Sequence, residues 1–311
     1  MSRAMMINGG QGSNADRMDV GMVGTGPALQ ALRKRIDRLA RAPGGVLILG
    51  ETGSGKELAA RALHAASPRH LRAFVALNCA AVPRELVEAE LFGSTAGAFT
   101  GARPREGLFR KAHRGTLFLD EIGDLALPAQ AALLRVIETG CVRPLGSDDT
   151  LEVDCRLLCA THRDLRVLAA AGGFRSDLYH RIATYTVTVP PLRDRPEDLP
   201  ALAEAVAGPE VERLTPAAWR ALKAHRWPGN VRELRNVLLR ALAITDGPIE
   251  PEDLDLEVPL PQGTGPARGS LRARIAHWAR QEVDAHGGNL RAAARTLGIS
   301  PTTLYRYLAE P

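Results

Sequence analysis

The chain has 311 residues, of which 45% are hydrophobic and 24% are charged, and its formal net charge is +5. A chain of this length can bury a large core and divides into two or three folding units, and its modest positive charge is compatible with nucleic acid. Its apolar runs are of strand length, which excludes a membrane-spanning helix, and its four cysteines lack the spacing of a zinc site or a disulfide framework.

The first elements lead up to a buried strand. Residues 1–21 are polar and Gly-rich, so they are predicted to form a disordered leader, and without a signal peptide the simplest compartment is the cytoplasm. Apolar residues recur at spacings of three and four over residues 29–39, which predicts a helix. The apolar run Val46 to Leu49 then predicts a buried parallel strand.

A phosphate-binding loop follows this strand. Residues 50–56 match G-x-x-x-x-G-K, in which glycines let backbone N–H groups close around phosphates and Lys56 neutralises the outer ones. The strand before the motif and the helix after it are the context it requires, and a plain glycine-rich turn is the alternative. Glu57 stands where a Ser or Thr magnesium ligand is usual. The predicted ATP-binding residues are Gly50, Glu51, Thr52, Gly53, Ser54, Gly55, Lys56 and Glu57.

Two adjacent carboxylates end a later strand. A strand over residues 74–77 ends at Asn78, and the apolar residues 115–119 predict a strand that runs into Asp120 and Glu121. Downstream of a phosphate loop, this pair fits one acid that holds Mg²⁺ and a second that polarises the attacking water. We assign Asp120 to the metal and Glu121 to the water. The alternative is an acidic strand end that faces solvent.

The stretch G-A-F-T-G-A lies between these two motifs, after a predicted helix over residues 83–91. It occupies the middle of residues 93–107, in which no helical or strand period holds. Phe99 has few apolar neighbours in sequence, so it either folds back onto the core or forms an exposed apolar tip. Its position beside an ATP site favours a loop that contacts a partner. The loop consists of Gly97, Ala98, Phe99, Thr100, Gly101 and Ala102.

The alternation of strands and helices continues after the acid pair. A helix is expected over residues 128–139 and a strand over residues 152–160. In the turn that follows, Thr161 or His162 either senses the terminal phosphate or simply caps the turn. This alternation predicts an α/β core over residues 22–190, with a parallel sheet flanked by helices.

A short helix over residues 174–181 carries two arginines, Arg175 and Arg181. Surface arginines on a helix are usually solvated or paired. In an ATPase of this layout, however, an arginine that reaches the γ-phosphate of the neighbouring subunit supplies transition-state charge. Both arginines are therefore candidates for this role.

The pattern becomes all helical over residues 191–256, which predicts a small helical lid. Arg232 lies in the first turn of its last helix, where it either points back at the nucleotide or forms a salt bridge. A lid arginine that touches the nucleotide would couple the state of ATP to the angle of the lid. The predicted lid helices span residues 197–206, 216–225 and 231–245.

A second, all-α unit follows a linker rich in Pro and Gly over residues 257–269. Residues 270–311 have the layout of a helix-turn-helix, in which Asn289 caps one helix and Ser300 caps the last. Its arginines outnumber its acids, as binding to a phosphate backbone favours, and a plain docking module is the alternative. The candidate DNA-contacting residues are Thr302, Thr303, Tyr305 and Arg306.

The motifs together resemble a known family, the bacterial enhancer-binding proteins that activate sigma-54 RNA polymerase. The resemblance covers roughly residues 22–256, as an AAA+ ATPase with its lid, and residues 270–308, as a Fis-type DNA-binding domain. Seven motifs occur in the order of the family: G-E-T-G-S-G-K-E, E-L-F-G, G-A-F-T-G-A, G-T-L-F-L-D-E-I-G, F-R-x-D-L-Y-x-R, P-P-L-R-D-R and W-P-G-N-V-R-E-L.

The resemblance implies an intact site for ATP and Mg²⁺. Glu57 is usual at its position in this family, Lys56 and the loop amides would hold ATP, and Asp120 and Glu121 would be the metal-binding and water-activating acids. Asn78 resembles the asparagine that restrains the catalytic glutamate until the right signal arrives.

The resemblance also implies an assembly and an output. Arg175 and Arg181 look like fingers that act across a subunit interface, and Arg232 looks like the lid sensor. Phe99 and Thr100 match the loop tip that contacts sigma-54. Such ATPases work as rings, commonly hexamers, because each finger completes the site of a neighbour.

Three features depart from the common pattern of this family. His162 stands where Asn is common, and the lid is short because Gly208 and Pro209 join helices that are usually farther apart. Before Met22 there is no room for a receiver or sensor domain, since even a small one needs on the order of 100 residues. Control is therefore expected from a separate inhibitory protein or from expression.

The leading hypothesis is an ATP-dependent activator of transcription by sigma-54 RNA polymerase. It would bind upstream double-stranded DNA as a dimer, assemble a ring, and use hydrolysis to move the G-A-F-T-G-A loop against sigma-54. One alternative is a DNA-binding repressor with a vestigial ATPase, which the intact Glu121 and Arg175 disfavour. Another is an ATPase that remodels a different protein, which the basic helix-turn-helix unit disfavours.

Overall fold

The computed structural model describes residues 21–98, 104–256, 280, 282–284, 286–287, 289–296 and 304. Its contacts divide the chain into two compact units, Met1–Leu256 and Glu257–Pro311, and each is described by itself. Within the described part of the chain, no helix is long and apolar enough to span a bilayer. The predicted leader over residues 1–20 and the linker lie outside the described residues, as do the loop-tip and DNA-contacting candidates Phe99, Thr100, Gly101, Ala102, Thr302, Thr303, Tyr305 and Arg306.

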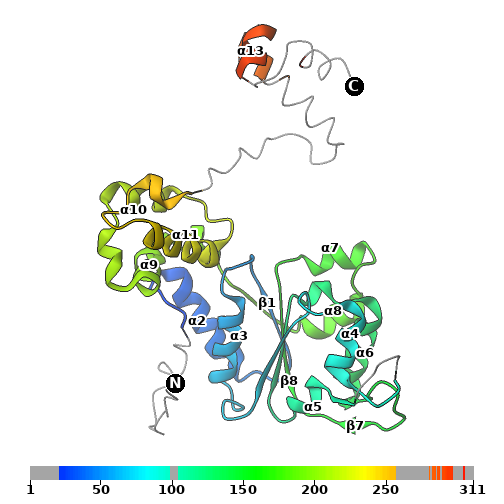
Figure 1. Cartoon of the computed structure of the whole chain (residues 1–311). Helices are drawn as coiled ribbons and strands as arrows, with labels where there is room; N and C mark the ends of the chain where they lie inside the picture. Colours follow the sequence, from blue (N-terminus) through cyan, green and yellow to red (C-terminus); the bar gives the residue numbers. More distant parts are fainter. Residues whose placement is uncertain are drawn as a thin grey trace. The chain divides into compact units, whose positions relative to one another are not determined.

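A five-stranded parallel sheet forms the centre of the first unit, with the strand order β2-β5-β8-β1-β9 (Figure 1). Its short apolar strands are typical of a parallel sheet that is covered on both faces. The expected strand over residues 152–160 is divided, since residues 153–155 are not in a strand. The strands are β1 (Val46–Leu49), β2 (Phe74–Asn78), β5 (Thr116–Asp120), β8 (Arg156–Thr161) and β9 (Tyr185–Thr188).

Two layers of helices cover the sheet. The side chains of Val46 and Ile48 pack toward α2 (Pro27–Ala40) and α3 (Lys56–Ala65), because alternate residues of a strand point to opposite faces. Leu47 packs into the other layer, which contains α4, α5, α6 and α8 (Figure 1). The bounds of these helices are α4 (Arg84–Phe92), α5 (Leu108–Lys111), α6 (Leu127–Thr139) and α8 (Ser176–Ile182), and α7 spans Leu165–Ala170.

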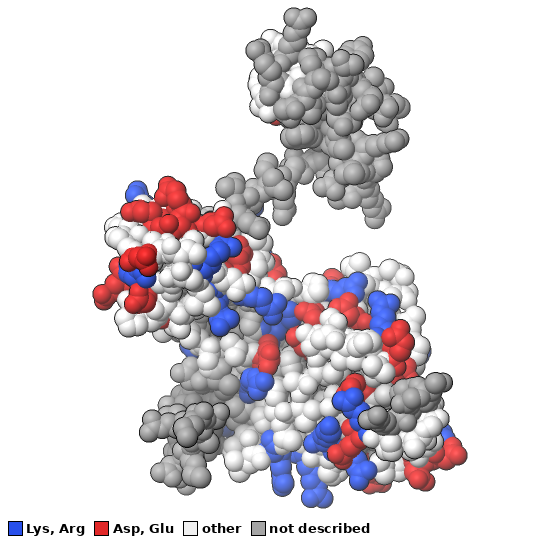
Figure 2. Space-filling model, in the orientation of Figure 1, with Lys and Arg blue, Asp and Glu red and all other residues white. Residues whose placement is uncertain are grey.

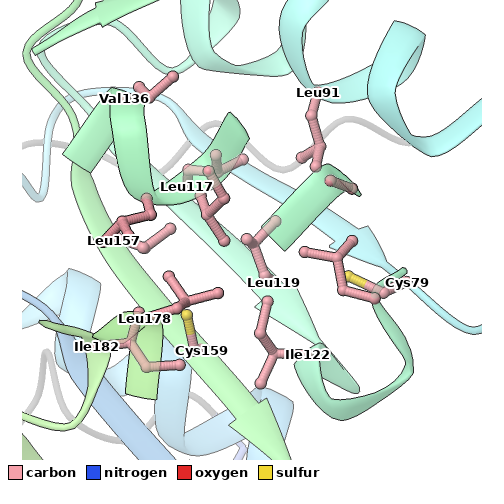
Figure 3. Close-up of a cluster of buried hydrophobic side chains, with 14 of the residues drawn as sticks. Cys79, Leu91, Leu117, Leu119, Ile122, Val136, Leu157, Cys159, Leu178 and Ile182 are labelled. Carbon is pink, nitrogen blue, oxygen red and sulfur yellow. The ribbon is translucent and has the colours of Figure 1, made fainter. Parts of the chain in front are cut away.

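Figure 3 shows the core of the second layer. Leu117 and Leu119 of β5 lie beside Leu157 and Cys159 of β8, and Leu178 of α8 packs onto them. Each of these aliphatic side chains is buried, and burial raises the pKa of the Cys159 thiol above its ordinary range. This layer holds β5 and β8 rigidly, so the residues that follow these strands have fixed positions.

Two small hairpins extend from the core. Strand β3 (Gly93–Ser94) pairs with β4 (Arg105–Glu106), and β6 (Cys141–Val142) pairs with β7 (Leu151–Glu152). The expectation that residues 93–107 contain no regular structure is therefore wrong at both ends of that run. Strands of two residues are too short to show a period in sequence.

The lid packs around its own apolar core, in which Leu222, Trp227 and Leu234 are buried. Its first expected helix begins later than predicted, because Pro196–Asp198 form a 3-10 turn before it. The Gly208 junction opens another 3-10 helix. The elements are η2 (Leu192–Asp194), η3 (Pro196–Asp198), α9 (Leu199–Ala207), η4 (Gly208–Arg213), α10 (Pro216–Ala224), α11 (Asn230–Ile244) and η5 (Pro251–Leu254).

In the second unit, the structure describes the helix α13 (Leu290–Thr296). The Asn289 side chain accepts a hydrogen bond from the Ala292 N–H at 3.2 Å, so the predicted N-cap is confirmed. Ala293, Ala294 and Leu304 are buried against one another. These contacts form the small core that a helical DNA-binding unit needs.

Candidate functional site

The glycine loop between β1 and α3 surrounds the Lys56 ammonium. Gly53 and Gly55 have φ angles of +75° and +106°, which residues with a side chain rarely adopt. Lys56 is only 6% exposed. Its Nζ donates to the carbonyls of Gly50 at 3.1 Å and Glu51 at 3.3 Å, and it lies 3.3 Å from Glu121 Oε1. These three acceptors match the three N–H donors of a lysine.

The acid pair lies at the carboxyl end of β5, next to the glycine loop. Glu121 has φ +51° and ψ +49°, a left-handed conformation that turns the chain sharply at the strand end. Its N–H donates to Asp120 Oδ1 at 3.0 Å. Burial, together with the charge of Glu121, raises the pKa of Asp120. A buried carboxylate next to a second one is suited to bind a divalent cation, because the positive charge would offset both the cost of burial and the repulsion between the two acids.

His162 contacts the predicted water-activating acid. Its Nδ1 lies 2.8 Å from Glu121 Oε2, and its backbone N–H lies 3.4 Å from the same oxygen. Burial alone would raise the pKa of Glu121, but the hydrogen bond with His162 and the charge of Lys56 outweigh it and lower that pKa. Glu121 is therefore ionised at neutral pH. The turn itself is capped by Thr161 Oγ1, which accepts from the Arg163 N–H at 3.1 Å.

Asn78 lies opposite Asp120 in the β2–β5 register. Its Oδ1 accepts a hydrogen bond from the Ala80 N–H at 2.9 Å, so its side chain bonds the turn that follows β2. The carboxylate of Glu121 is instead bonded by Lys56 and His162. The restraint of Glu121 by Asn78 stays a prediction.

The two candidate fingers lie at opposite ends of α8. Arg175 forms a two-pronged ion pair with Asp177, with contacts of 3.1 and 2.7 Å. Arg181 lies in the last turn and lines an open cavity that Arg41 and Arg156 also line, near the starts of β1 and β8. Six residues of helix separate the two arginines by about 9 Å along the axis. The structure therefore gives them different surroundings.

Arg232 lies in the first turn of α11, beside the glycine loop. Its Cβ is 2.9 Å from the position that a Cβ on Gly53 would occupy. In the described part of the chain, no ion pair of Arg232 occurs, so the salt-bridge alternative has no support there. The predicted lid sensor is thus placed at the nucleotide loop with its side chain exposed.

The base of the G-A-F-T-G-A loop rests on the second hairpin. Gly97 has φ +76°, and Ala98 N–H lies 3.4 Å from the Thr95 carbonyl. Thr95 bonds the Leu145 carbonyl through its N–H at 3.0 Å and its hydroxyl at 3.2 Å. A Cβ on Gly146 would lie only 2.8 Å from Ala98 Cβ. Sequence reasoning missed this support, because the turn between β6 and β7 carries no motif.

Sequence reasoning also missed three lid residues that bind the glycine loop. Arg193 and Asn230 bond the Glu51 carboxylate, and Arg195 bonds the Ser54 carbonyl. The signal was present, because these residues belong to the motifs P-P-L-R-D-R and W-P-G-N. The motifs themselves do not show that these three residues contact the glycine loop.

The parallel sheet, the glycine loop with its lysine, the acid pair and the helical lid define an AAA+ P-loop fold. Comparison with family models places a sigma-54 interaction domain at residues 22–188, an AAA+ ATPase lid domain at residues 193–268 and a Fis-family bacterial regulatory domain at residues 284–310. The chain therefore belongs to the family of sigma-54-dependent transcriptional activators.

Individual relatives agree with this assignment. The chain is 48% identical over 248 residues to the response regulator protein PilR of Pseudomonas aeruginosa, covering 77% of this chain and 56% of PilR. It is 43% identical over 314 residues to the anaerobic nitric oxide reductase transcription regulator NorR of Aeromonas hydrophila, covering 92% of this chain and 62% of NorR. The chain thus spans less than two thirds of the length of both relatives.

Solved structures show the same fold. NtrX from Brucella abortus in complex with ADP aligns with a TM-score of 0.72 at 33% identity, covering 93% of this chain and 68% of NtrX. NtrX in complex with ATP aligns with a TM-score of 0.71, also at 33% identity, covering 94% and 69%.

Proposed function

We propose that this chain is an ATP-hydrolysing activator of transcription by sigma-54 RNA polymerase. The observation that carries the proposal is the convergence of Lys56 and Glu121, 3.3 Å apart, at the glycine loop. A cation for the phosphates and an ionised carboxylate for water are the two groups that phosphoryl transfer to water requires. Because the chain matches a sigma-54 interaction domain, we propose that ATP hydrolysis acts on sigma-54.

The residues of the loop and of the strand ends divide the work. Mg²⁺–ATP, when bound, supplies the electrophilic γ-phosphoryl group. The loop N–H groups and the N-terminus of α3 would bind its phosphates, and Lys56 would exchange its carbonyl partners for phosphate oxygens. Asp120 would hold the metal, and the carboxylate of Glu121 would accept the proton of the attacking water.

The remaining site residues would connect subunits and carry the output. Arg181, which lines an open cavity, and Arg175, once released from Asp177, would reach the γ-phosphate in a neighbouring subunit of a ring. Arg232 would contact the nucleotide and thereby couple the state of ATP to the angle of the lid. The loop of residues 97–102 would contact sigma-54, and the helix-turn-helix unit would hold the protein on upstream DNA.

A trapping experiment tests this proposal. The full chain is incubated with ADP and a metal-fluoride mimic of the γ-phosphate, and its complex with purified sigma-54 is measured by gel filtration. We expect the wild type to retain sigma-54 only in the trapped state. Thr100→Ala should lose sigma-54 while its ATPase rate stays within about two-fold, because the loop lies outside the ATP site. Thr25→Ala, at an exposed position before α2, is the matched control.

The outcomes separate the alternatives. A wild type that hydrolyses ATP but never retains sigma-54 would contradict the activator function and favour remodelling of another partner. A wild type that hydrolyses no ATP would favour a regulator with a vestigial ATPase. For the DNA contact, Arg306→Ala should weaken binding to double-stranded DNA and reduce the salt dependence by about one counterion if this arginine touches a phosphate.

A further inference from the structure

The outer side of the glycine loop is bound by the lid. Three successive carbonyls of the loop accept hydrogen bonds from lid residues: Thr52 from the Asn230 side chain at 3.1 Å, Gly53 from the Val231 N–H at 3.1 Å, and Ser54 from the Arg195 side chain at 3.0 Å. The N–H and C=O of a trans peptide point in opposite directions. Because the Thr52 and Ser54 carbonyls are held on the lid side, the N–H groups in the same peptides, those of Gly53 and Gly55, point away from the lid.

Glu51 adds a charged contact to the same surface. Arg193 donates to its two carboxylate oxygens at 2.6 and 2.8 Å, and Asn230 Nδ2 donates to one of them at 3.1 Å. The hydrogen bonds from Arg193, and then that from Asn230, lower the pKa of Glu51. Two-pronged arginine–carboxylate pairs are among the stronger hydrogen-bonded contacts in proteins. Figure 2 shows basic and acidic side chains next to one another on the face where the lid meets the sheet.

Asn230 joins two lid segments to the loop at once. It is fully buried and adopts a φ of +54°, and its Oδ1 accepts the Leu192 N–H at 2.8 Å while its Nδ2 bonds the loop. The backbone before it packs equally closely, since a Cβ on Gly53 would lie 2.2 Å from the Gly229 carbonyl oxygen. A buried side chain with both ends bonded fixes the geometry on both sides of it.

We propose that Glu51, Arg193 and Asn230 form a lid latch that positions both the phosphate-binding N–H groups and the lid sensor. Arg232 lies two residues after Asn230 in the first turn of α11, so a lid held at Asn230 holds Arg232 beside the glycine loop. Through the latch, the conformation of the glycine loop determines the position of the lid helix α11. The three residues act by positioning and do not touch the reacting atoms. This inference rests on the proposed ATP hydrolysis.

Isosteric variants of the full chain test the latch. Asn230→Asp replaces the two amide donors by a carboxylate that faces Glu51. We expect it to raise the Kd for ATP by about ten-fold or more and to remove the nucleotide-dependent protection of α11 in hydrogen exchange. Glu51→Gln in the same chain should recover part of the affinity, because a glutamine amide donates to the new carboxylate. Recovery of both the affinity and the nucleotide-dependent protection of α11 would show that Glu51 and Asn230 act as a pair.

The matched control is Glu210→Gln. It removes another ion pair of the lid, with Arg213 at 2.9 Å, that does not touch the loop, and it should leave Kd and KM unchanged. Arg193→Lys tests the latch if Asn230→Asp does not fold, because the side chains of Arg193 and Glu51 are 43% and 42% exposed and the substitution should not disturb the core. Lysine cannot make the two-pronged contact, so KM should rise several-fold while kcat changes less.

The results separate the latch from the function on which it rests. A wild type that neither binds nor hydrolyses ATP would remove the proposed function. A wild type that does both, with Asn230→Asp and Arg193→Lys behaving like Glu210→Gln, would overturn the latch alone. Equal losses in Asn230→Asp and in its double variant with Glu51→Gln would also overturn it.

Discussion

Gly53 in the phosphate loop and Gly97 in the G-A-F-T-G-A loop have nearly the same φ angle, +75° and +76°, but different surroundings. A Cβ on Gly53 would collide with the Gly229 carbonyl oxygen at 2.2 Å. A Cβ on Gly97 would meet no described atom within 4 Å. Glycine is therefore needed at Gly53 for space and conformation, whereas the described residues around Gly97 require it for conformation alone.

This difference contrasts the phosphate loop with the described base of the G-A-F-T-G-A loop at Gly97. The phosphate loop is held from outside by the lid and from inside by Lys56, so contacts within the chain fix its shape. The loop base at Gly97 is supported mainly through Thr95, two residues earlier. A loop whose shape is fixed by contacts within its own chain suits binding of a small ligand.

The largest expected effect concerns Glu121, which lies beside the phosphate loop. Glu121→Gln should lower kcat for ATP hydrolysis by about 10²–10⁴-fold, because it removes the acceptor of the water proton. The Kd for ATP should stay the same or fall, since the variant releases Lys56 from its ion pair. Nucleotide titration and steady-state kinetics check both values. A loss of binding would contradict the assigned role.

Gly53→Ala comes next. The left-handed backbone and the collision with Gly229 should cost about 1–3 kcal/mol and raise the Kd for ATP by about ten-fold or more. Calorimetric titration and thermal unfolding measure the two effects. Wild-type affinity in this variant would show that the Gly229 backbone moves to make room for the new Cβ. Gly53 and Gly97 would then not differ in their need for space.

Gly97→Ala has the same φ problem without the collision. We expect a local cost of about 1–2 kcal/mol, an ATPase rate within about two-fold of the wild type, and weaker retention of sigma-54 in the trapped state. ATPase assays and the gel-filtration assay measure these two responses on one preparation. An ATPase loss as large as that of Gly53→Ala would mean that the two loops are not independent.

The smallest effect concerns His64, on the helix that follows the phosphate loop. Burial lowers its pKa below the ordinary value of 6.5, and its Nδ1 lies 2.9 Å from Thr116 Oγ1. The His64 side chain therefore becomes protonated at a higher pH in the unfolded chain than in the folded chain. The stability contribution is complete above pH 6.5 and is lost as the pH falls below that value. Urea unfolding should show a shallower fall from pH 7 to 5.5 in His64→Gln.

The sequence was sufficient for features that depend on neighbouring residues. The apolar run Val46–Leu49 is strand β1 as predicted, and Asp120 and Glu121 do lie at a strand end beside the lysine. Strand β9 was missed, although its central Val187 is buried, because Tyr185–Thr188 alternates too briefly to stand out from its flanks.

Contacts between distant residues could not be predicted in this way. Glu51 and Arg193 are 142 positions apart, and Glu51 and Asn230 are 179 apart. They meet because β1 lies between β8 and β9, so the chain that leaves β9 passes directly beside the glycine loop. His162 and Glu121 likewise meet because β8 and β5 are neighbours, and the order of strands is not encoded in any single motif.

The contact between Lys56 and Glu121 gives the buried ammonium a negatively charged partner from its own chain. The buried ammonium has a carboxylate beside it, so an incoming anion would compete with a group of like charge for this cation. For a monoanion this exchange gains little Coulomb energy, whereas a triphosphate brings several charges to the same cation. We therefore expect the ion pair to favour binding of polyphosphates over chloride and carboxylates.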